Sequence, residues 1–352
     1  MAGTPIWFES ADAELAPSPE AFAGLLLLPA LQQQAKVVVD SRLDPVWLDG
    51  TAKLPAIYNG WWGYTGAWPY EYAGSSPPAE TRAAGAAACF TGGVDSFYTL
   101  LSGGERFDTL VHVHGYDIPL EDHARIQSFE RSFREVAART GKLAILLRTN
   151  LREHPIFASV NWERTHGAAL AAAGLILSPR IQSLVVPSSY RYLHLRPWGS
   201  HPETDPLWST SRTSIVHDDA TFSREEKTRR IVDEPMVWEH LRVCWENRVP
   251  TGNCSACHKC VRTMAAIAAY GRLAEFTVFD RTTPLAARLD ALPPLPEHLI
   301  APWGNLLELD LAPPDRGALD RLLERSRPGA RPGMMRRLVR FGMRMRRRPR
   351  SG

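Results

Sequence analysis

The chain has 352 residues, of which 44% are hydrophobic and 22% charged, a composition typical of a globular protein with a sizeable core. Its longest apolar run, residues 22–31, contains Pro29 and is too short to span a bilayer. The N-terminus has no basic leader and carries Glu9, Asp12 and Glu14, so we expect no signal peptide and a cytoplasmic protein.

The net charge of +3 conceals an asymmetry along the chain. Residues 325–352 contain 11 arginines and no acidic residue, which leaves 30 basic against 38 acidic residues in the rest. From Pro332 onward, Met, Leu and Phe side chains alternate with the arginines as in a basic amphipathic helix. Such a tail is typical either of a solvated, disordered terminus or of a segment that contacts RNA or an anionic membrane.

Residues 1–84 are expected to form a mixed α/β extension that ends in a linker rich in Gly, Ser and Pro. A helix is predicted over residues 19–28 because Ser18 suits its N-cap, and residues 35–39 predict a strand. We interpret the aromatic residues within 58–72 as packing against the next domain, with a wall that stacks on a substrate as the alternative.

From residue 85, predicted strands and helices alternate. The strands are residues 86–90, 109–114, 143–147 and 183–186, and the helices between them are residues 96–101, 120–139 and 166–175. This alternation predicts an α/β domain over residues 85–270, with a Rossmann-like parallel sheet covered by helices. Such sheets bind ligands at the carboxyl ends of their strands, where the strand order reverses.

The regular alternation stops after residue 190. Residues 191–214 form a long loop with several Pro and Trp residues, and loops of this length are usually functional or disordered. Helices are predicted at residues 224–232 and 261–269, and residues 271–324 are read as a helical, Pro-rich C-terminal segment.

A glycine-containing turn joins the first predicted strand of this domain to its first helix. It consists of Thr91, Gly92, Gly93, Val94, Asp95 and Ser96. Glycines let the backbone approach a phosphate closely, and the free N–H groups of a helix N-terminus point at the bound anion. The turn lacks the Lys-Ser/Thr pair of the Walker motif and the third glycine of the dinucleotide fingerprint.

Four of the five cysteines lie within 17 residues, namely Cys244, Cys254, Cys257 and Cys260. In a cytosolic chain this grouping favours a metal site over disulfides, and the spacing suits a tetrahedral zinc. Lys259 and Arg262 would offset part of the thiolate charge. Two alternatives remain, namely haem attachment at the Cys-x-x-Cys-His stretch, which would require export, and an iron–sulfur cluster.

The turn at Thr91 resembles the Ser-Gly-Gly-x-Asp-Ser loop of the PP-loop ATP pyrophosphatase superfamily, with threonine in place of the first serine. The resemblance implies a HUP/Rossmann-like fold and a reaction that splits ATP between its α- and β-phosphates, adenylates a substrate oxygen and lets a nucleophile displace AMP. It also implies that the turn binds pyrophosphate. Because Asp95 would repel phosphate there, Mg²⁺ is implied as well.

The resemblance further implies contacts with the rest of the nucleotide. His114 would lie against adenine, and His166 and Gly167, at the expected start of a helix, would contact the nucleotide. The alternative for His166 is a capping or core histidine.

Together, the turn and the four cysteines are similar to the 7-cyano-7-deazaguanine synthase family over about residues 85–265. That similarity implies a structural zinc and a carboxylate that ATP and ammonia convert to an amide and then a nitrile. If four cysteines bind zinc, only Cys89 is left, on a strand expected to be buried, which makes ammonia the simpler nucleophile than sulfur.

Candidate substrate residues follow the fourth predicted strand. Ser188, Ser189, Tyr190, His201 and Asp205 are candidates for polar contacts, and Trp198 and Trp208 for stacking. Their structural alternatives are turn capping by the serines and loop packing by the tryptophans. Asp205 or His201 is the candidate general base for ammonium, acting beside Asp95 and Ser96.

The leading hypothesis is an ATP-dependent, AMP-forming carbon–nitrogen ligase that acts on a small-molecule acid. One alternative is a tRNA-modifying thiolation enzyme with the arginine-rich tail as its RNA anchor. The other is a nucleotide-binding scaffold without catalysis.

Overall fold

The computed structural model describes residues 3–327, which form two compact units. The first contains the described residues up to Cys254 together with Ala274–Phe279, and the second contains Ser255–Leu273 and the described residues from Asp280 onward. Within residues 3–327, no helix is long and apolar enough to cross a membrane. The amphipathic pattern expected after Pro332 lies outside the described residues.

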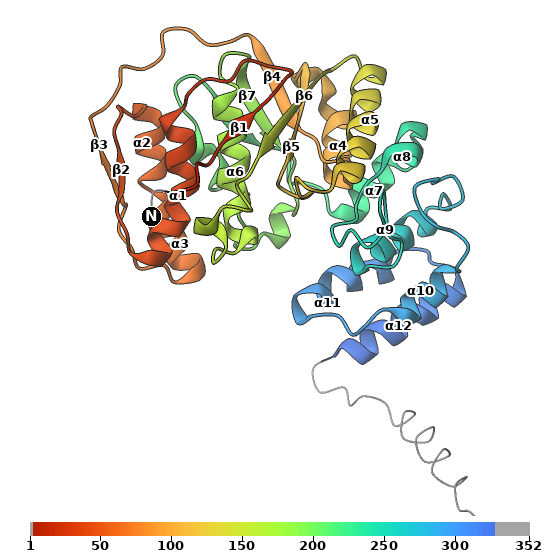
Figure 1. The fold of residues 1–352 in the computed structure, drawn as a ribbon. Coiled ribbons are helices and arrows are strands. Elements are labelled where there is room, and N and C mark those ends of the chain that lie inside the picture. The colour runs from red at the N-terminus through yellow and green to blue at the C-terminus, as the bar shows by residue number, and fades with distance from the viewer. Residues whose placement is uncertain (1–2, 328–352) are drawn as a thin grey trace, which may run out of the picture. The chain divides into compact units, whose positions relative to one another are not determined.

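A six-stranded sheet forms the centre of the first unit, in the order β1-β6-β5-β4-β7-β8 (Figure 1). Its strands, in that order, are Phe8–Glu9, Leu143–Thr149, Thr109–His114, Gly85–Cys89, Ile181–Val186 and Ser214–His217. β1 runs antiparallel to β6, and the other neighbours are parallel. The predicted α/β class and its four strands are confirmed, whereas β8 was missed because it lies in the irregular stretch after residue 190.

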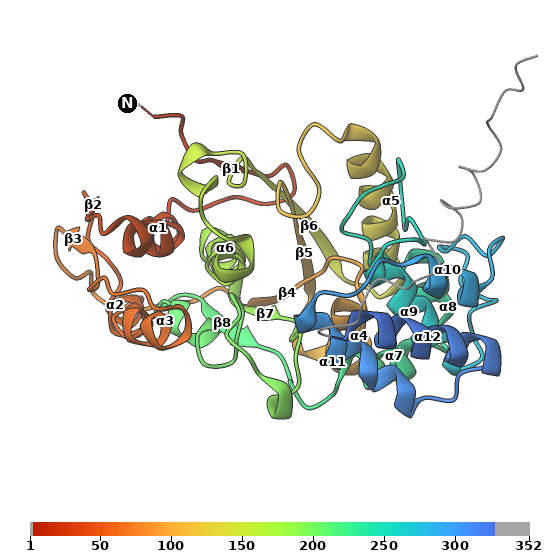
Figure 2. The same ribbon diagram turned by 90° about the horizontal axis from the view of Figure 1, so that it is seen from below.

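Helices cover both faces of this sheet. Figure 2 shows α4 (Val94–Gly103) and α5 (His123–Arg139) on one side and α6 (Trp162–Ile176) on the other. The strand order reverses between β4 and β7, and the loops after β4, β5, β6 and β7 start at the same edge because these strands are parallel. The expected helix start at His166 is wrong, since Asn161 caps α6 and accepts a hydrogen bond from the Glu163 N–H.

The N-terminal residues, expected to form a mixed α/β extension and a linker over residues 1–84, belong to the same compact unit as the sheet. They form α1 (Pro19–Gln33), β2 (Val37–Val39), α2 (Pro45–Thr51), α3 (Leu54–Trp62) and β3 (Tyr70–Tyr72). Ser18 caps α1 as predicted, and its Oγ accepts from the Ala21 N–H at 3.2 Å. The aromatic side chains between Tyr58 and Tyr70 pack in or against the main apolar core, which agrees with their interpretation as packing residues.

Short helices and turns complete the two units. In the first unit these are η1 (Gly104–Arg106), η2 (Pro155–Phe157), η3 (Tyr192–His194), η4 (Asp205–Trp208), α7 (Arg224–Ile231) and α8 (Pro235–His240). The second unit contains α9 (His258–Ala269), α10 (Leu285–Ala291), α11 (Glu297–Gly304), η5 (Asn305–Glu308) and α12 (Pro313–Ser326). Its interior is apolar, with Leu289, Trp303 and Leu319 fully buried.

Candidate functional site

The glycine turn after β4 leads into α4 without a side-chain cap. Gly92 has φ +73°, a left-handed conformation that favours glycine, and its carbonyl accepts from the Arg242 N–H at 2.7 Å. Gly93 precedes α4 in extended conformation and makes no side-chain capping hydrogen bond. Ser96 Oγ donates to the Gly93 carbonyl at 3.0 Å and braces the turn. No side chain therefore caps the N-terminus of α4, where N–H groups attract an anion.

Two cations from α7 contact the carboxylate of Asp95 at the start of α4. The Arg224 guanidinium donates to Asp95 Oδ2, and Lys227 Nζ lies 3.6 Å from Oδ1. Lys227 is 1% exposed and also donates to the Ser188 carbonyl and hydroxyl, at 2.6 and 2.8 Å. Its ammonium thus joins the turn after β4 to the end of β7, at the point where the strand order reverses.

Sequence reasoning missed Arg224 and Lys227. It treated Asp95 as a charge that needed Mg²⁺, whereas the fold already places two cations beside that carboxylate. They lie 129 and 132 positions further along the chain, so no spacing pattern connects them with the turn. The one local signal is the capping box of Ser223 and Glu226, which marks the start of the helix that carries both cations.

His114 lies at the carboxyl end of β5, at the same edge of the sheet as the turn. It is buried, and neither of its ring nitrogens has a hydrogen-bond partner within residues 3–327. Burial lowers the pKa of His114 to about 4, so the ring is neutral at pH 7. It lines a cavity of about 640 Å³ together with Glu130, Arg134 and Arg148. His114 is therefore a neutral, buried imidazole that lines this cavity.

His166 and Gly167 lie in the second turn of α6 and hold the loop around Trp198 against this helix. A Cβ on Gly167 would lie 1.9 Å from the Gly199 carbonyl oxygen, so only glycine permits this close approach. The His166 ring is 5.5 Å from the Trp198 ring, edge to face, and its Nδ1 lies 3.2 Å from the Trp162 carbonyl. Burial lowers the pKa of His166. These contacts agree with the alternative of a core histidine.

Three side chains of the loop after β7 form a stacked cluster. The Arg196 guanidinium lies over the rings of Tyr190 and Trp198, 4.7 and 4.8 Å from their centroids. Burial raises the pKa of Tyr190, and the charges of Arg196 and Arg224 oppose this effect. The structure thus brings together Tyr190 and Trp198, two of the predicted substrate residues, with Arg196, which sequence reasoning missed. Ser188 and the half-buried Ser189 precede this cluster.

The other predicted substrate and base residues have interior partners. Asp205 is 1% exposed, accepts from the Ser200 hydroxyl at 2.6 Å and from the His201 N–H at 3.1 Å, and lies 2.7 Å from His217 Nδ1. Trp208 is buried against α1, since its ring would lie 3.3 Å from a Cβ on Gly24. His201 packs against Trp61, and burial lowers its pKa. Loop packing, the structural alternative considered for the tryptophans, describes the position of Trp208.

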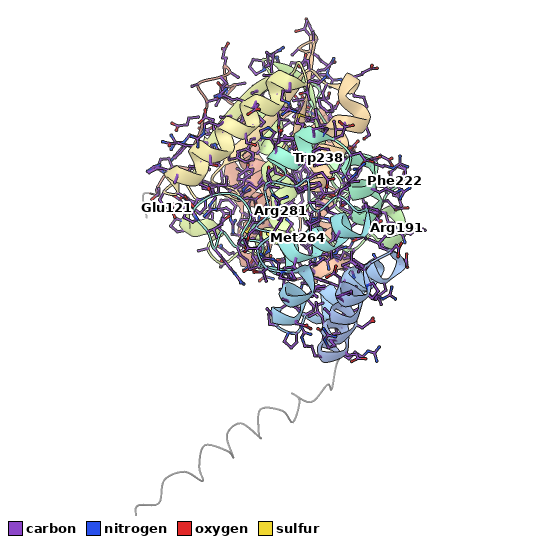
Figure 3. The ribbon with its side chains drawn as sticks, turned by 90° about the vertical axis from the view of Figure 1, so that its right-hand side faces the viewer. Glu121, Arg191, Phe222, Trp238, Met264 and Arg281 are labelled. Carbon is purple, nitrogen blue, oxygen red and sulfur yellow. The ribbon has the colours of Figure 1, made fainter. Side chains whose placement is uncertain are left out.

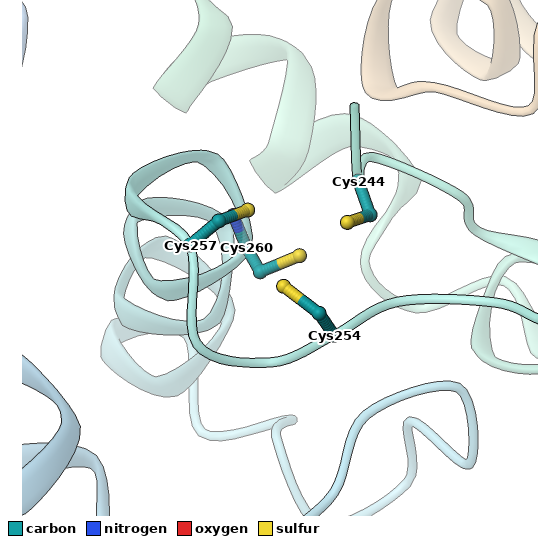
Figure 4. A group of neighbouring side chains, drawn as sticks. All are labelled: Cys244, Cys254, Cys257 and Cys260. Carbon is teal, nitrogen blue, oxygen red and sulfur yellow. The ribbon is translucent and has the colours of Figure 1, made fainter. Parts of the chain in front are cut away.

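The four clustered cysteines face one another (Figure 4). Their Sγ atoms all lie within 4.8 Å of one another, and none of the four forms a disulfide bond. Cys257 is the N-cap of α9, and its Sγ accepts from the Cys260 N–H at 3.4 Å. Asn253 fixes the backbone before Cys244, because its Oδ1 accepts from the Val243 and Cys244 N–H groups. Four convergent thiols can hold a tetrahedral metal ion such as zinc.

Cys89 lies apart from this cluster, on β4. It is 7% exposed, and burial raises the pKa of its thiol to about 12, so it stays protonated at neutral pH.

Comparisons of the chain with models of protein families, with curated proteins and with solved structures found no match.

Proposed function

We propose that this protein is a cytoplasmic, ATP-dependent carbon–nitrogen ligase of the PP-loop type with a HUP-like fold, which forms AMP and pyrophosphate. One observation carries the proposal. The uncapped N-terminus of α4, the left-handed Gly92 and the cations Arg224 and Lys227 converge where the strand order reverses. Uncapped N–H groups and the partly exposed Arg224 guanidinium suit a polyphosphate better than they suit a neutral ligand.

Each group of the turn has a separate task in this proposal. The N–H groups at Gly92, Gly93 and Val94 and the hydroxyls of Thr91 and Ser96 bind the pyrophosphate portion of ATP. Asp95 is the carboxylate that would hold Mg²⁺, an ion that neutralises phosphate charge when bound. Arg224, whose side chain is 22% exposed, can form hydrogen bonds with phosphate oxygens, whereas the buried Lys227 holds Asp95 and Ser188 in place.

The cysteines favour a nitrogen nucleophile over sulfur carried by this chain. Cys89 is buried and protonated, and the other four thiols form a cluster suited to a structural zinc. An ammonia-type nucleophile needs no protein thiol. In the loop after β7, Arg196, which lies over the rings of Tyr190 and Trp198, is our candidate for binding the carboxylate of an acid substrate.

The test is product analysis with ATP, Mg²⁺, ammonium and a panel of carboxylic acids. We expect AMP and pyrophosphate with at least one acid, whereas ADP and phosphate would refute the proposal. Asp95→Asn is expected to lower turnover at least about 1000-fold, or roughly 4 kcal/mol in transition-state free energy. Asp108→Asn, at the opposite end of the neighbouring strand β5, is the matched control and should keep full activity.

Two further outcomes would point to the other hypotheses. Tight, salt-sensitive RNA binding that disappears when residues 325–352 are removed would favour a tRNA-thiolating enzyme. ATP binding without turnover on any acid would favour a nucleotide-binding scaffold.

A further inference from the structure

A second group of metal-ligating side chains lies where α5 meets α8. These two helices lie side by side in the first unit, and Figure 3 shows α5 next to the short helix that carries Trp238. Glu135 comes from the C-terminal half of α5, and Glu239 and His240 are the last two residues of α8. The metal-ligating atoms of these three side chains all lie within 4.8 Å of one another.

His240 is the central member of this group. Its side chain is 9% exposed, and its Nε2 lies 3.5 Å from Glu135 Oε1 and 3.8 Å from Glu239 Oε2. In the described part of the chain this buried Nε2 has no hydrogen-bond partner. The opposite ring nitrogen, Nδ1, lies 2.9 Å from Ser132 Oγ, a contact that orients the ring. The imidazole is thus held with its second nitrogen facing two carboxylates, as in many metal sites.

We infer that Glu135, Glu239 and His240 form a binding site for a divalent first-row metal ion, distinct from the cysteine cluster. Bonds of about 2.0–2.2 Å from one ion to imidazole and carboxylate ligands place the ligand atoms roughly 3.3–3.6 Å apart in a tetrahedral site. The two observed separations from Nε2 are close to that range. One nitrogen and two oxygen ligands suit Zn²⁺ or Mn²⁺, and water can complete the coordination because both carboxylates are half-exposed.

Arg139 competes with a metal ion for this position. Its Nη1 lies 2.6 Å from Glu239 Oε2 and 3.7 Å from Glu135 Oε1, so the guanidinium supplies the positive charge that both carboxylates need. A bound cation would displace Arg139, which is partly exposed and can turn toward solvent. A substitution that removes the guanidinium is therefore expected to tighten metal binding.

The backbone that carries the site contacts the glycine turn. The His240 carbonyl oxygen is 3.5 Å from the point that a Cβ on Gly92 would occupy, and the N–H of Arg242, two residues on, donates to the Gly92 carbonyl. An ion bound by the last two residues of α8 would restrain the segment that supports this turn. The site does not depend on the proposed ligase activity, because metal binding is measured without ATP.

The experiment is a Mn²⁺ titration of the full-length protein after its cysteine cluster has been loaded with Zn²⁺. Mn²⁺ is the probe because it prefers oxygen and nitrogen ligands to thiolates. Paramagnetic resonance of free Mn²⁺ should show one binding equivalent per chain. Glu135→Gln and His240→Gln should each weaken binding at least tenfold, and Arg139→Gln should tighten it severalfold.

Glu130→Gln is the matched control, since Glu130 also lies on α5 but pairs with Arg134. It should bind Mn²⁺ as the unchanged protein does. Circular dichroism melting curves identify any variant that fails to fold, and the conservative Glu135→Gln keeps the test open if His240→Gln does not fold. Absence of binding, or equal binding in Glu135→Gln and the unchanged protein, would overturn the inference and leave only an ion-pair network around Arg139.

Discussion

The cysteine cluster and the glycine turn are two candidate sites that are assembled in opposite ways. All four cysteines come from a stretch of 17 residues, and a backbone clamp by Asn253 and the N-cap position of Cys257 bring their thiols together. In the turn, by contrast, the charged partners of Asp95 come from α7, far along the chain. They are Arg224 and the buried Lys227. A site whose ligands are close in the sequence can be predicted from their spacing. For a site that also needs cations from a distant helix, only the local part can be predicted.

The largest effect is expected at the cysteine cluster. Cys257→Ser removes one thiolate ligand, and since metal affinity of on the order of 10 kcal/mol is coupled to folding in small zinc sites, we expect loss of the metal and a marked fall in the melting temperature. Metal content per chain and thermal unfolding are the measurements. Cys89→Ala is the control, because Cys89 is also buried but lies outside the cluster, and this variant should retain the metal. Unchanged metal content in Cys257→Ser would contradict a four-thiolate site.

The next effect separates the two cations of the turn. Lys227→Met removes a buried ammonium with two hydrogen bonds to Ser188, and we expect a loss of about 3 kcal/mol in unfolding free energy. Arg224→Gln breaks a more exposed ion pair and should cost about 1 kcal/mol or less. Urea denaturation measures both. Equal losses of unfolding free energy in the two variants would contradict the expectation that the buried Lys227 stabilises the fold more than Arg224 does.

The free energy of unfolding should depend on pH, because protonation of the buried histidines of β5 destabilises the folded chain. Burial lowers the pKa of His114 to about 4 and that of His112 well below its usual value. The unfolded chain thus binds more protons than the folded one below about pH 6.5, so stability is full above that pH and falls toward pH 4. His114 alone accounts for up to about 3 kcal/mol of this loss.

Urea midpoints at pH 7 and pH 5 measure this dependence. His114→Gln should reduce this pH dependence, and His112 should account for what remains, whereas substitution of His123, an exposed residue of α5, by Gln should leave it unchanged. A slope that does not change in His114→Gln would place the titrating group elsewhere.

A further comparison is between two glycines with positive φ. Replacing Gly92 (φ +73°) or Gly141 (φ +65°) by alanine should lower the free energy of unfolding by about 1–2 kcal/mol, because a residue with a Cβ is strained in this conformation. Contacts at 3.5 Å around Gly92 add no clash. Only Gly92→Ala is expected to weaken ATP binding, measured by calorimetry. If Gly141→Ala weakened ATP binding as much as Gly92→Ala, the result would contradict ATP binding at the glycine turn.

Much of the fold follows from local patterns. The four parallel strands, the cap of α1 by Ser18 and the position of α7 were predictable, because apolar periodicity and capping residues act over a few positions. The start of α6 was predicted four residues too late, since Asn161 is the cap that begins it. β8 was missed because an edge strand of four residues has too little periodicity to stand out from a loop.

By itself, the sequence determined the two candidate sites, namely the glycine turn and the four spaced thiols, since their ligands or hydrogen-bond donors are neighbours along the chain. Only the tertiary structure decided what surrounds them. It placed Arg224 and Lys227 against Asp95, and it brought His240 from α8 to Glu135 of α5. These contacts depend on packing between segments about a hundred residues apart in several cases, which no local spacing specifies.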